Sequence, residues 1–317
     1  MTTPTPKTPL RIGTRGSPLA LAQAYEPRTR LMDAWDLPED AFEIAIITTA
    51  GDRIQDRALR EVGGKGLFTR EIEEQLTDGR IDIAVHSMKD MPTLQPDGLV
   101  IDCLLEREDP RDAFVSHLHD GIAALPRGAV VGTSSLRRRA QLLHRRDDLT
   151  VVEFRGNVQT RLRKLSDGVA EATFLAMAGL RRLGLSDVAR GPVAVEDMLP
   201  AMAQGCIGIE RRVSDTDTAS MLAPLNHAPS AIRLAAERAC LARLDGSCET
   251  PIAGLAELSG NTIRLRVEVL RPDGSDVIAE DVTADASDAE ALGEEVGQTL
   301  LGRAPVGFFE WRENAPA

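Results

Sequence analysis

The sequence predicts an α/β protein with a smaller α+β part at its C-terminal end. Over the first two-thirds of the chain, short apolar runs typical of strands alternate with helical patterns, as in α/β domains with mostly parallel sheets. In the last third, a helix is instead followed by three strand-like runs and a final helix. The length of 317 residues is too great for one small core and favours two or three domains.

The α/β part contains eight runs with the length and apolar character of strands. These runs are Leu10–Thr14, Phe42–Thr49, Ile81–Ser87, Leu99–Leu105, Ala113–Ser116, Ala129–Ser134, Thr150–Phe154 and Ala172–Ala178. Helical patterns lie between several of them, at Leu19–Met32, Thr69–Leu76, Leu136–His144 and Val158–Leu165. Asp109-Pro110 interrupts the pattern after the fourth run, so a domain boundary is predicted there.

The last third contains the elements of a small α+β domain. The predicted order is a helix over Ser230–Leu244, strands over Ile252–Leu258, Thr262–Leu270 and Val277–Val282, and a helix from Ala286 to Leu301. A Pro-Asp-Gly turn at 272–274 joins the second and third strands as a hairpin.

Composition excludes several classes of protein. The net charge of −12 argues against a general nucleic-acid-binding protein, and 3% aromatic residues leave little for base stacking. No apolar run approaches the ~20 residues that cross a membrane. The first ten residues are polar and lack a signal core, so a cytoplasmic location is expected. The four cysteines form no Cys-x-x-Cys pair and no evident disulfide framework.

Positive charge is concentrated in one segment. Residues 127–190 hold 13 Lys and Arg against 6 Asp and Glu, whereas residues 256–317 hold 5 against 13. Only 4 of the 37 basic residues are lysines, and arginine offers a planar fork that matches a carboxylate or a phosphate. A basic segment in an acidic protein indicates a focused site for a small polyanion, although a codon bias toward arginine explains the composition equally well.

Polar and basic side chains follow five of the predicted strands. Ligands of open α/β sheets bind beyond the carboxyl ends of the strands, and hydroxyls, guanidinium groups and helix N-termini together bind anions. Any one such loop is best explained by ordinary helix caps and solvated arginines, but five together predict an anion site. The five loops are residues 14–18, 48–52, 86–92, 132–138 and 155–157.

Two further residues stand out by their chemistry. Asp90 is an acid in these basic surroundings, where it stays ionised and can stabilise a developing cation; its alternative role is a surface ion pair. Cys248 lies in a turn-rich polar loop and is a candidate for covalent chemistry. Cys103 and Cys206 lie in strand-like runs and Cys240 on a helix, so these three are expected to be small buried apolar residues.

Three other motifs do not carry the chemistry they suggest. Residues 62–66 are not a Walker A loop, because Leu59 and Gly66 stand where glycine and Ser/Thr are required; Gly63–Gly66 is predicted to be a mobile loop or lid. His117 and His119 have no further ligand nearby, so no metal is predicted. A dinucleotide-binding G-x-G-x-x-G pattern is absent.

Together these segments resemble the porphobilinogen deaminase (hydroxymethylbilane synthase) family over nearly the whole chain. The matching segments are residues 11–15, 62–68, 82–90, 106–114, 132–138, 155–158, 178–180 and 204–205. The resemblance implies a cytoplasmic, monomeric transferase of tetrapyrrole (porphyrin and heme) biosynthesis. Such an enzyme joins four porphobilinogen molecules head to tail on a covalent dipyrromethane cofactor, releases ammonia at each step and hydrolyses the product to hydroxymethylbilane.

The resemblance also implies a domain organisation. It consists of two α/β domains of the periplasmic-binding-protein type flanking a cleft, plus a small α+β C-terminal domain. The implied ranges are 9–105 with 206–223 for domain 1, 111–199 for domain 2 and 228–317 for domain 3, which carries the cofactor loop. A dozen carboxylates on the growing oligopyrrole account for arginines concentrated in an acidic protein.

Carried over residue by residue, the resemblance assigns Asp90 as the catalytic carboxylate and Cys248 as the thioether attachment site of the cofactor. The cofactor- and substrate-binding positions are Arg15, Ser17, Lys65, Phe68, Ser87, Lys89, Thr133, Ser134, Ser135, Arg137, Arg138, Arg155, Gly156, Asn157, Arg161, Arg182 and Gln204. Two positions depart from the family pattern: Ser247 replaces a glycine before the cysteine, and Ala170-Glu171-Ala172 replaces Tyr-Asp-Ala.

Two alternatives come from other classes of protein. A bilobed binding or sensor protein that closes on an anion fits the α/β pair equally well, but it gives no role to Asp90 or Cys248. Nucleic-acid binding through residues 137–164 fits poorly with the net charge and the few aromatic residues.

Overall fold

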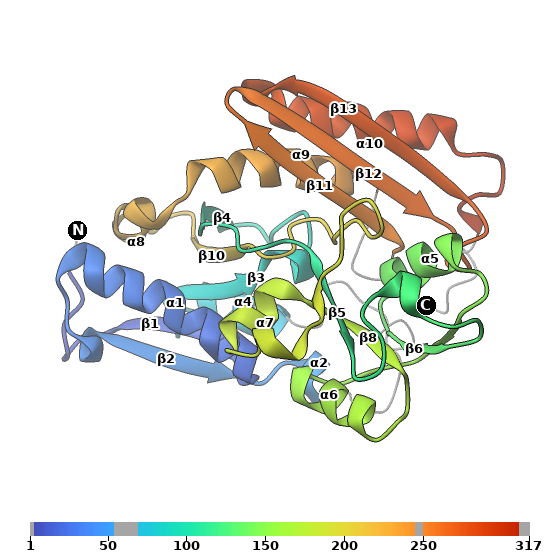
Figure 1. Ribbon diagram of the computed structural model, residues 1–317. Coiled ribbons are helices and arrows are strands. Elements are labelled where there is room, and N and C mark those ends of the chain that lie inside the picture. Colours follow the sequence, from blue (N-terminus) through green and yellow to red (C-terminus); the bar gives the residue numbers. More distant parts are fainter. Residues whose placement is uncertain (1–2, 54–68, 245–249, 311–317) are drawn as a thin grey trace. The chain divides into compact units, whose positions relative to one another are not determined.

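The computed structural model describes residues 3–53, 69–244 and 250–310 (Figure 1). The chain divides into two compact units, one of residues 1–108 with 206–231 and the other of residues 109–205 with 232–317. In the described part of the chain, no helix is long and apolar enough to cross a membrane.

The first unit is built on a five-stranded sheet of order β2-β1-β3-β10-β4. Strands β1, β2 and β3 are parallel, and β10 runs antiparallel to both of its neighbours. The strands are β1 (Leu10–Arg15), β2 (Phe42–Ile47), β3 (Ile83–Ser87), β4 (Leu99–Leu104) and β10 (Ile207–Arg212). The helices are α1 (Pro18–Trp35), α2 (Ala50–Arg53), α4 (Arg70–Thr77) and α8 (Thr216–Leu222), with 3₁₀ turns at Glu39–Ala41, Met88–Asp90 and Ala223–Leu225.

The alternation of side chains along β3 divides the core of this unit into two layers. Ile83 and Val85 pack in one cluster with Ala24 and Leu31 of α1. Ala84, which points to the other face, packs with Ile72 and Leu76 of α4. Helices α1 and α4 therefore cover opposite faces of the sheet.

The second unit contains a sheet with the same arrangement, in the order β7-β6-β8-β5-β9. Strands β6, β7 and β8 are parallel, whereas β5 is antiparallel to β8 and β9. The strands are β5 (Asp112–Ser116), β6 (Val130–Gly132), β7 (Thr150–Val152), β8 (Ala172–Ala176) and β9 (Gly191–Pro192). The helices are α5 (Leu136–Arg145), α6 (Val158–Ser166) and α7 (Met177–Arg182), with 3₁₀ turns at Ile122–Ala124 and Ser186–Val188.

The C-terminal part of the second unit is a three-stranded antiparallel meander with helices. Its elements are α9 (Ala228–Arg243), β11 (Ile252–Ser259), β12 (Thr262–Leu270), β13 (Val277–Asp285), a 3₁₀ turn at Ala286–Asp288 and α10 (Ala289–Arg303). Helices α9 and α10 approach closely at Gly293, where a Cβ would lie 2.2 Å from the carbonyl oxygen of Ala236. The core of this part joins both helices to the sheet.

The predicted fold class is confirmed by two mixed α/β sheets and a small α+β part. The strands predicted over 42–49, 129–134 and 150–154 each end two residues earlier than expected. The strand predicted over Ala172–Ala178 is also too long, because β8 ends at Ala176 and residues 177–178 begin helix α7. Residues 177–180 are all buried, and a short continuous apolar run has no periodicity that distinguishes a buried strand from a buried helix.

Candidate active site

The carboxyl ends of β1, β2 and β3 meet at one edge of the first sheet, because the three strands are parallel. Arg15 is the last residue of β1, and its Nε lies 3.1 Å from Oδ1 of Asp52, which follows β2. Ser17 accepts a 3.2 Å hydrogen bond from the amide of Ala20 and caps α1. Burial raises the pKa of Asp52, but hydrogen bonds from Arg15 and Thr49 outweigh it and the net shift is downward. The loops after β1 and β2 therefore meet, as predicted.

Asp90 ends the 3₁₀ turn that follows β3, next to Ser87 and the half-buried Lys89. Its side chain is exposed, and it forms no hydrogen bond or ion pair with any residue that the structure describes. The turn is held to β10 by a 3.0 Å hydrogen bond from the amide of Met88 to the carbonyl of Cys206. Asp90 is thus an ionisable group presented to solvent on an anchored turn.

A second set of predicted residues lies at the carboxyl ends of β6 and β7. Ser134 Oγ accepts a 3.1 Å hydrogen bond from the amide of Phe154, which joins the loops after these two strands. Ser135 and Asn157 cap the N-termini of α5 and α6 through hydrogen bonds from the amides of Arg138 and Thr160. Thr133 is buried and accepts a 3.1 Å hydrogen bond from the amide of Ser135. Two helix N-termini therefore open at the same sheet edge.

Two arginines at this edge, Arg155 and Arg161, lie near the acid Glu153. Arg155 Nη1 is buried without a hydrogen-bond partner among the described residues, and the Nε of this residue lies 3.6 Å from Glu153. Arg161 Nε donates a 2.9 Å hydrogen bond to the carbonyl of Gly156. Burial lowers the pKa of Arg161 to about 10, and the positive charges of Arg138 and Arg155 act in the same direction while Glu153 opposes them.

Gly156 is required by its backbone. Its φ of +117° is one that side-chain-bearing residues rarely adopt, and a Cβ would lie 2.5 Å from Thr160. The glycine thus lets the chain turn sharply from Arg155 into the cap of α6.

Arg137 and Arg138, which were predicted to bind ligand, are buried around a carboxylate. Arg137 Nη2 lies 2.8 Å from Oδ2 of Asp112, and Arg138 Nη2 lies 2.7 Å from Oδ1. Gln204 Nε2 donates to the same Oδ1 at 3.0 Å and to the carbonyl of Pro110 at 2.7 Å. Burial raises the pKa of Asp112, but the charges of the two arginines outweigh it and hold this pKa well below its usual range.

Asp112 was not singled out from the sequence. The feature that could have drawn attention to Asp112 is that it is a charged residue at the start of β5, a strand whose five residues are all buried. Gln204 lies in a segment of unusual backbone, between Ala203 at φ +60° and Gly205 at φ +92°. Arg182 Nη2 donates a 3.2 Å hydrogen bond to the carbonyl of Gly205.

Several predictions fall on residues that the structure does not describe. Lys65, Phe68, Cys248, Ser247 and the loop at 63–66 lie outside the described ranges. The other three cysteines are buried, as predicted. Burial raises the pKa of the Cys103 and Cys240 thiols to about 12 in both cases.

The departure at Glu171 has a local partner. Glu171 Oε2 lies 2.9 Å from Nε2 of His119, and Glu171 Oε1 accepts from the amide of Val130. The hydrogen bond with His119, joined by that from Val130, lowers the pKa of Glu171. Among residues 3–53, 69–244 and 250–310, no three His, Cys, Asp or Glu side chains are grouped to hold a metal ion.

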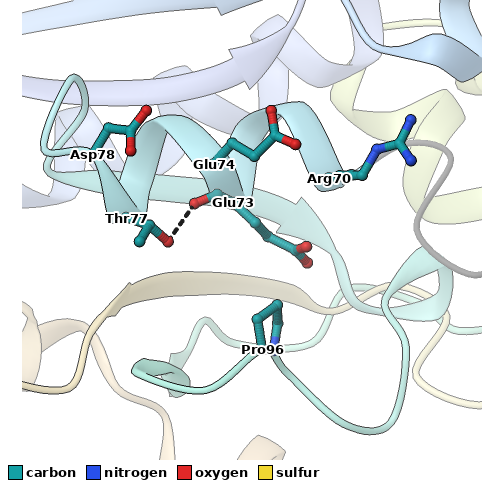
Figure 2. A pocket seen from close by; sticks show the side chains of 6 residues that line it. All are labelled: Arg70, Glu73, Glu74, Thr77, Asp78 and Pro96. Atoms are coloured by element: carbon teal, nitrogen blue, oxygen red, sulfur yellow. Dashed lines mark hydrogen bonds between the residues drawn. The ribbon is translucent and has the colours of Figure 1, made fainter.

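A pocket of about 330 Å³ lies elsewhere in the first unit, beside α4 (Figure 2). It is lined by Arg70, Glu73, Glu74, Thr77, Asp78 and Pro96. None of the predicted site residues lines it, and its three carboxylates suit no polyanion. The strand ends, and not this pocket, are therefore the candidate polyanion site.

The strand-end residues fit a dipyrromethane carrying acetate and propionate groups. Such a group needs several cationic or N–H donors for its carboxylates, and the β6–β7 edge offers the unpartnered Nη1 of Arg155, the guanidinium of Arg161 and two helix N-termini. The donor set at this edge is thus that of a polycarboxylate site.

Comparisons with known proteins agree with this chemistry. Residues 10–220 match the family model described as the dipyrromethane-cofactor-binding domain of porphobilinogen deaminase, and residues 231–302 match the model of its C-terminal domain. A porphobilinogen deaminase from Paracoccus denitrificans (strain Pd 1222) is 66% identical over 308 residues, which cover 97% of this chain and 98% of the relative.

Solved structures with similar folds include periplasmic binding proteins. One is a probable extracellular amino-acid-binding protein of an ABC transporter from Bacillus subtilis, with a TM-score of 0.42 and 12% identity over 68% of this chain and 89% of that one. Another is a periplasmic sulfonate-binding protein of a putative transporter from Methylobacillus flagellatus KT, with a TM-score of 0.38 and 13% identity over 72% and 66%. The two family models and the relative show that the chain belongs to the porphobilinogen deaminase family of transferases and carries that family's dipyrromethane-binding domain.

Proposed function

We propose that the described strand ends and Asp90 carry out the stepwise head-to-tail condensation of four porphobilinogen molecules with release of ammonia. The observation that carries this proposal is the pair of half-buried arginines Arg155 and Arg161, with Nη1 of Arg155 unpartnered among the described residues. The chain also presents an exposed Asp90, which has no partner in the described part of the structure. The first feature suits acidic substrates, and the second suits a reaction that develops positive charge.

The arginines and hydroxyls hold carboxylates. Each porphobilinogen brings an acetate and a propionate, and guanidinium groups bind such groups through two parallel hydrogen bonds. Arg155, Arg161 and the amides at the start of α5 and α6 fill this role on the second sheet, and Arg15 with Lys89 on the first. Lys65, Phe68, Ser87, Arg182 and Gln204 complete the proposed set. Each hydrogen bond to a charged group contributes roughly 1.5–3 kcal/mol, so a few of them position the growing oligopyrrole.

Arg137 and Arg138 act differently in this scheme. Their guanidinium groups pair with Asp112 inside the unit, and Arg137 Nη1 and Arg138 Nη1 donate to the carbonyls of Leu199 and Phe174. Their ligand-binding role is therefore proposed only for N–H groups that these acceptors do not engage. Their main effect is to fix the start of α5, whose N-terminus faces the β6–β7 edge.

Asp90 stabilises the positive charge that develops as ammonia leaves. A carboxylate that makes no internal ion pair is available to accept hydrogen bonds from pyrrole N–H groups, and the interaction strengthens as those groups become cationic. When bound, the dipyrromethane supplies the pyrrole carbon to which the first substrate is joined. Asp90 needs only to remain ionised, so it acts through electrostatics rather than as a nucleophile.

Cys248 is proposed to anchor the dipyrromethane through a thioether. Intact-protein mass spectrometry of the purified chain should show an adduct of two deaminated pyrrole units. The adduct should be lost in Cys248→Ala and kept in the matched control Cys240→Ala. An unmodified wild-type chain that still consumes porphobilinogen at full rate would contradict the proposal. Tight carboxylate binding without ammonia release would instead indicate a binding protein.

The proposal also includes the setting of the enzyme. We place the enzyme in the cytoplasm as a monomer, as the resemblance to the family implies. Size-exclusion chromatography with light scattering checks the oligomeric state.

A further inference from the structure

A buried pair of titratable residues lies immediately before the Asp90 turn. His86 is the fourth residue of β3 and 6% exposed, and Glu210 on β10 is fully buried. His86 Nε2 lies 3.0 Å from Glu210 Oε2, so the ring can donate a hydrogen bond to the carboxylate. Removing such groups from water is costly and needs a compensating role. The mechanism above uses neither residue.

Strand register explains why the two side chains meet. His86 is opposite Gly208 and Ala84 is opposite Glu210, so His86 and Glu210 are diagonal neighbours on one face. Gly208 leaves that face open, since a Cβ there would lie 2.1 Å from Sδ of Met88. Met88, the first residue of the turn, therefore packs on the strand that carries Glu210.

A second acid, Glu73, faces the pair from helix α4, which covers the same face of the sheet. Burial raises the pKa of Glu73, the charge of Glu210 raises it further, and Thr69 and His86 oppose this. Glu73 also lines the pocket beside α4, and Figure 2 shows its side chain directed toward the space above Pro96. Glu210 Oε1 has no hydrogen-bond partner in the described part of the chain. Among the described residues, His86 is therefore the hydrogen-bond partner of the Glu210 carboxylate.

The pair ties β3 to β10 at the point where the chain leaves the sheet. Beyond it, Ser87 is paired with Ile207, and the amide of Met88 donates to the carbonyl of Cys206, directly before β10. The chain then turns to Lys89 and Asp90. His86 and Met88, which make these side-chain and main-chain links from β3 and the turn, lie four and two residues before Asp90. Loss of the pair would therefore loosen the turn more than the rest of the sheet.

We propose that His86 and Glu210 are positioning residues that hold the Lys89-Asp90 turn in the geometry required for catalysis. They act through the turn and touch no substrate. This rests on the proposed role of Asp90. A misplacement of about 1 Å at a catalytic group costs on the order of a hundredfold in rate, so a modest loosening has a measurable effect.

The test is Glu210→Gln, which keeps the shape and removes the charge. The matched control is Asp102→Asn: Asp102 on β4 pairs with Arg211, the neighbour of Glu210 on β10, with Arg211 Nε 3.0 Å from Asp102 Oδ1. Both variants remove one charged link from the same strand. Steady-state kinetics, melting temperature and hydrogen exchange of the peptide over 83–91 are measured for each, and the cofactor adduct is checked by mass.

Glu210→Gln should lower kcat about tenfold with KM for porphobilinogen unchanged, and the Met88 amide should exchange faster. Asp102→Asn should keep both kcat and that exchange rate, and it should lose little stability because the Asp102 side chain is 44% exposed. If Glu210→Gln retains normal kcat and exchange, or if the two variants change equally, the pair is merely structural and the inference fails.

A parallel Asp90→Asn measurement separates the two proposals. Normal turnover in Asp90→Asn would overturn the proposed function. A dead Asp90→Asn beside a fully active Glu210→Gln overturns only the positioning role. If Glu210→Gln does not fold, His86→Gln replaces it with the same readouts.

Discussion

Nη2 of Arg138 lies 2.7 Å from Oδ1 of Asp112, and both side chains are almost wholly removed from solvent, at 6% and 0% exposed. With Arg137 and Gln204, this contact makes a buried polar cluster at the carboxyl end of β8, where Asp112 is paired with Ala176. An arginine that the family resemblance implies to bind ligand therefore already pairs with a carboxylate inside the protein. The same charge that suits an anionic substrate is needed to keep Asp112 ionised.

Asp112→Asn should destabilise the protein strongly. The change leaves two buried guanidinium groups without their counter-charge, and breaking a buried ion pair from one side costs about 3–5 kcal/mol. Urea unfolding monitored by circular dichroism measures the loss. Glu196→Gln, which removes an exposed partner of Arg266, is the control and should unfold at the wild-type urea concentration. Equal stability of the two variants would contradict the conclusion that Asp112 is the counter-charge of the two buried arginines.

Asp112 should also make the stability of the protein depend on pH in the acid range. Its folded-state pKa lies below its unfolded value, so the unfolded chain binds a proton first as pH falls. The contribution is complete above about pH 4 and declines by up to ~1.4 kcal/mol per pH unit below it. The free energy of unfolding of the wild type should therefore fall more steeply between pH 4 and pH 3 than that of Asp112→Asn. Parallel curves would refute the assignment.

Asp90→Asn should abolish turnover without unfolding the chain. Asp90 is exposed and has no partner among the described residues, so the melting temperature should stay at the wild-type value. The rate should fall because the neutral amide no longer stabilises a cation. Asp97→Asn, at another exposed acid shortly after the turn, is the control and should turn over normally. Ammonia release and porphobilinogen consumption are the assays.

Arg161→Gln should weaken substrate binding more than turnover. Loss of one hydrogen bond to a charged group corresponds to roughly 1.5–3 kcal/mol, or about a 10- to 150-fold rise in KM. Arg163→Gln removes an exposed charge from the same helix and should leave KM nearly unchanged. If both variants raise KM equally, the effect is one of general charge, and added salt should then mimic it.

Thiol counting should distinguish the loaded protein from the bare chain. Cys103, Cys206 and Cys240 are buried, and the pKa of two of these thiols is raised to about 12, so none should react with a thiol reagent at pH 8 in the native state. After denaturation, three thiols should react in the protein that carries the dipyrromethane adduct, because a thioether occupies Cys248. Four thiols should react in protein that lacks the adduct, because Cys248 is then a free thiol. Four reactive thiols in material carrying the adduct would exclude attachment through a cysteine.

The sequence by itself determined many helix starts and turns, because caps and turn residues act on their immediate neighbours in the chain. Helix α1 begins at Pro18, a residue with a fixed φ, directly after its cap Ser17, and α6 begins directly after its cap Asn157. The hairpin of β12 and β13 is marked by its turn residues. Loop residues after parallel strands also had to share an edge, which placed Arg15 near Asp52 and Ser134 near Phe154.

Tertiary structure alone decided which charged residues are available to a ligand. Nothing in the run Leu136–Arg139 separates the buried Arg138 from the exposed Arg139; the difference is made by Asp112, 26 residues away along the chain on a strand that lies antiparallel to β8. Likewise, His86 meets Glu210 because β10 enters the first sheet from 124 residues further along the chain. Burial and pairing depend on which strands become neighbours, and that is a property of the assembled sheet, to which residue type and spacing contribute only in part.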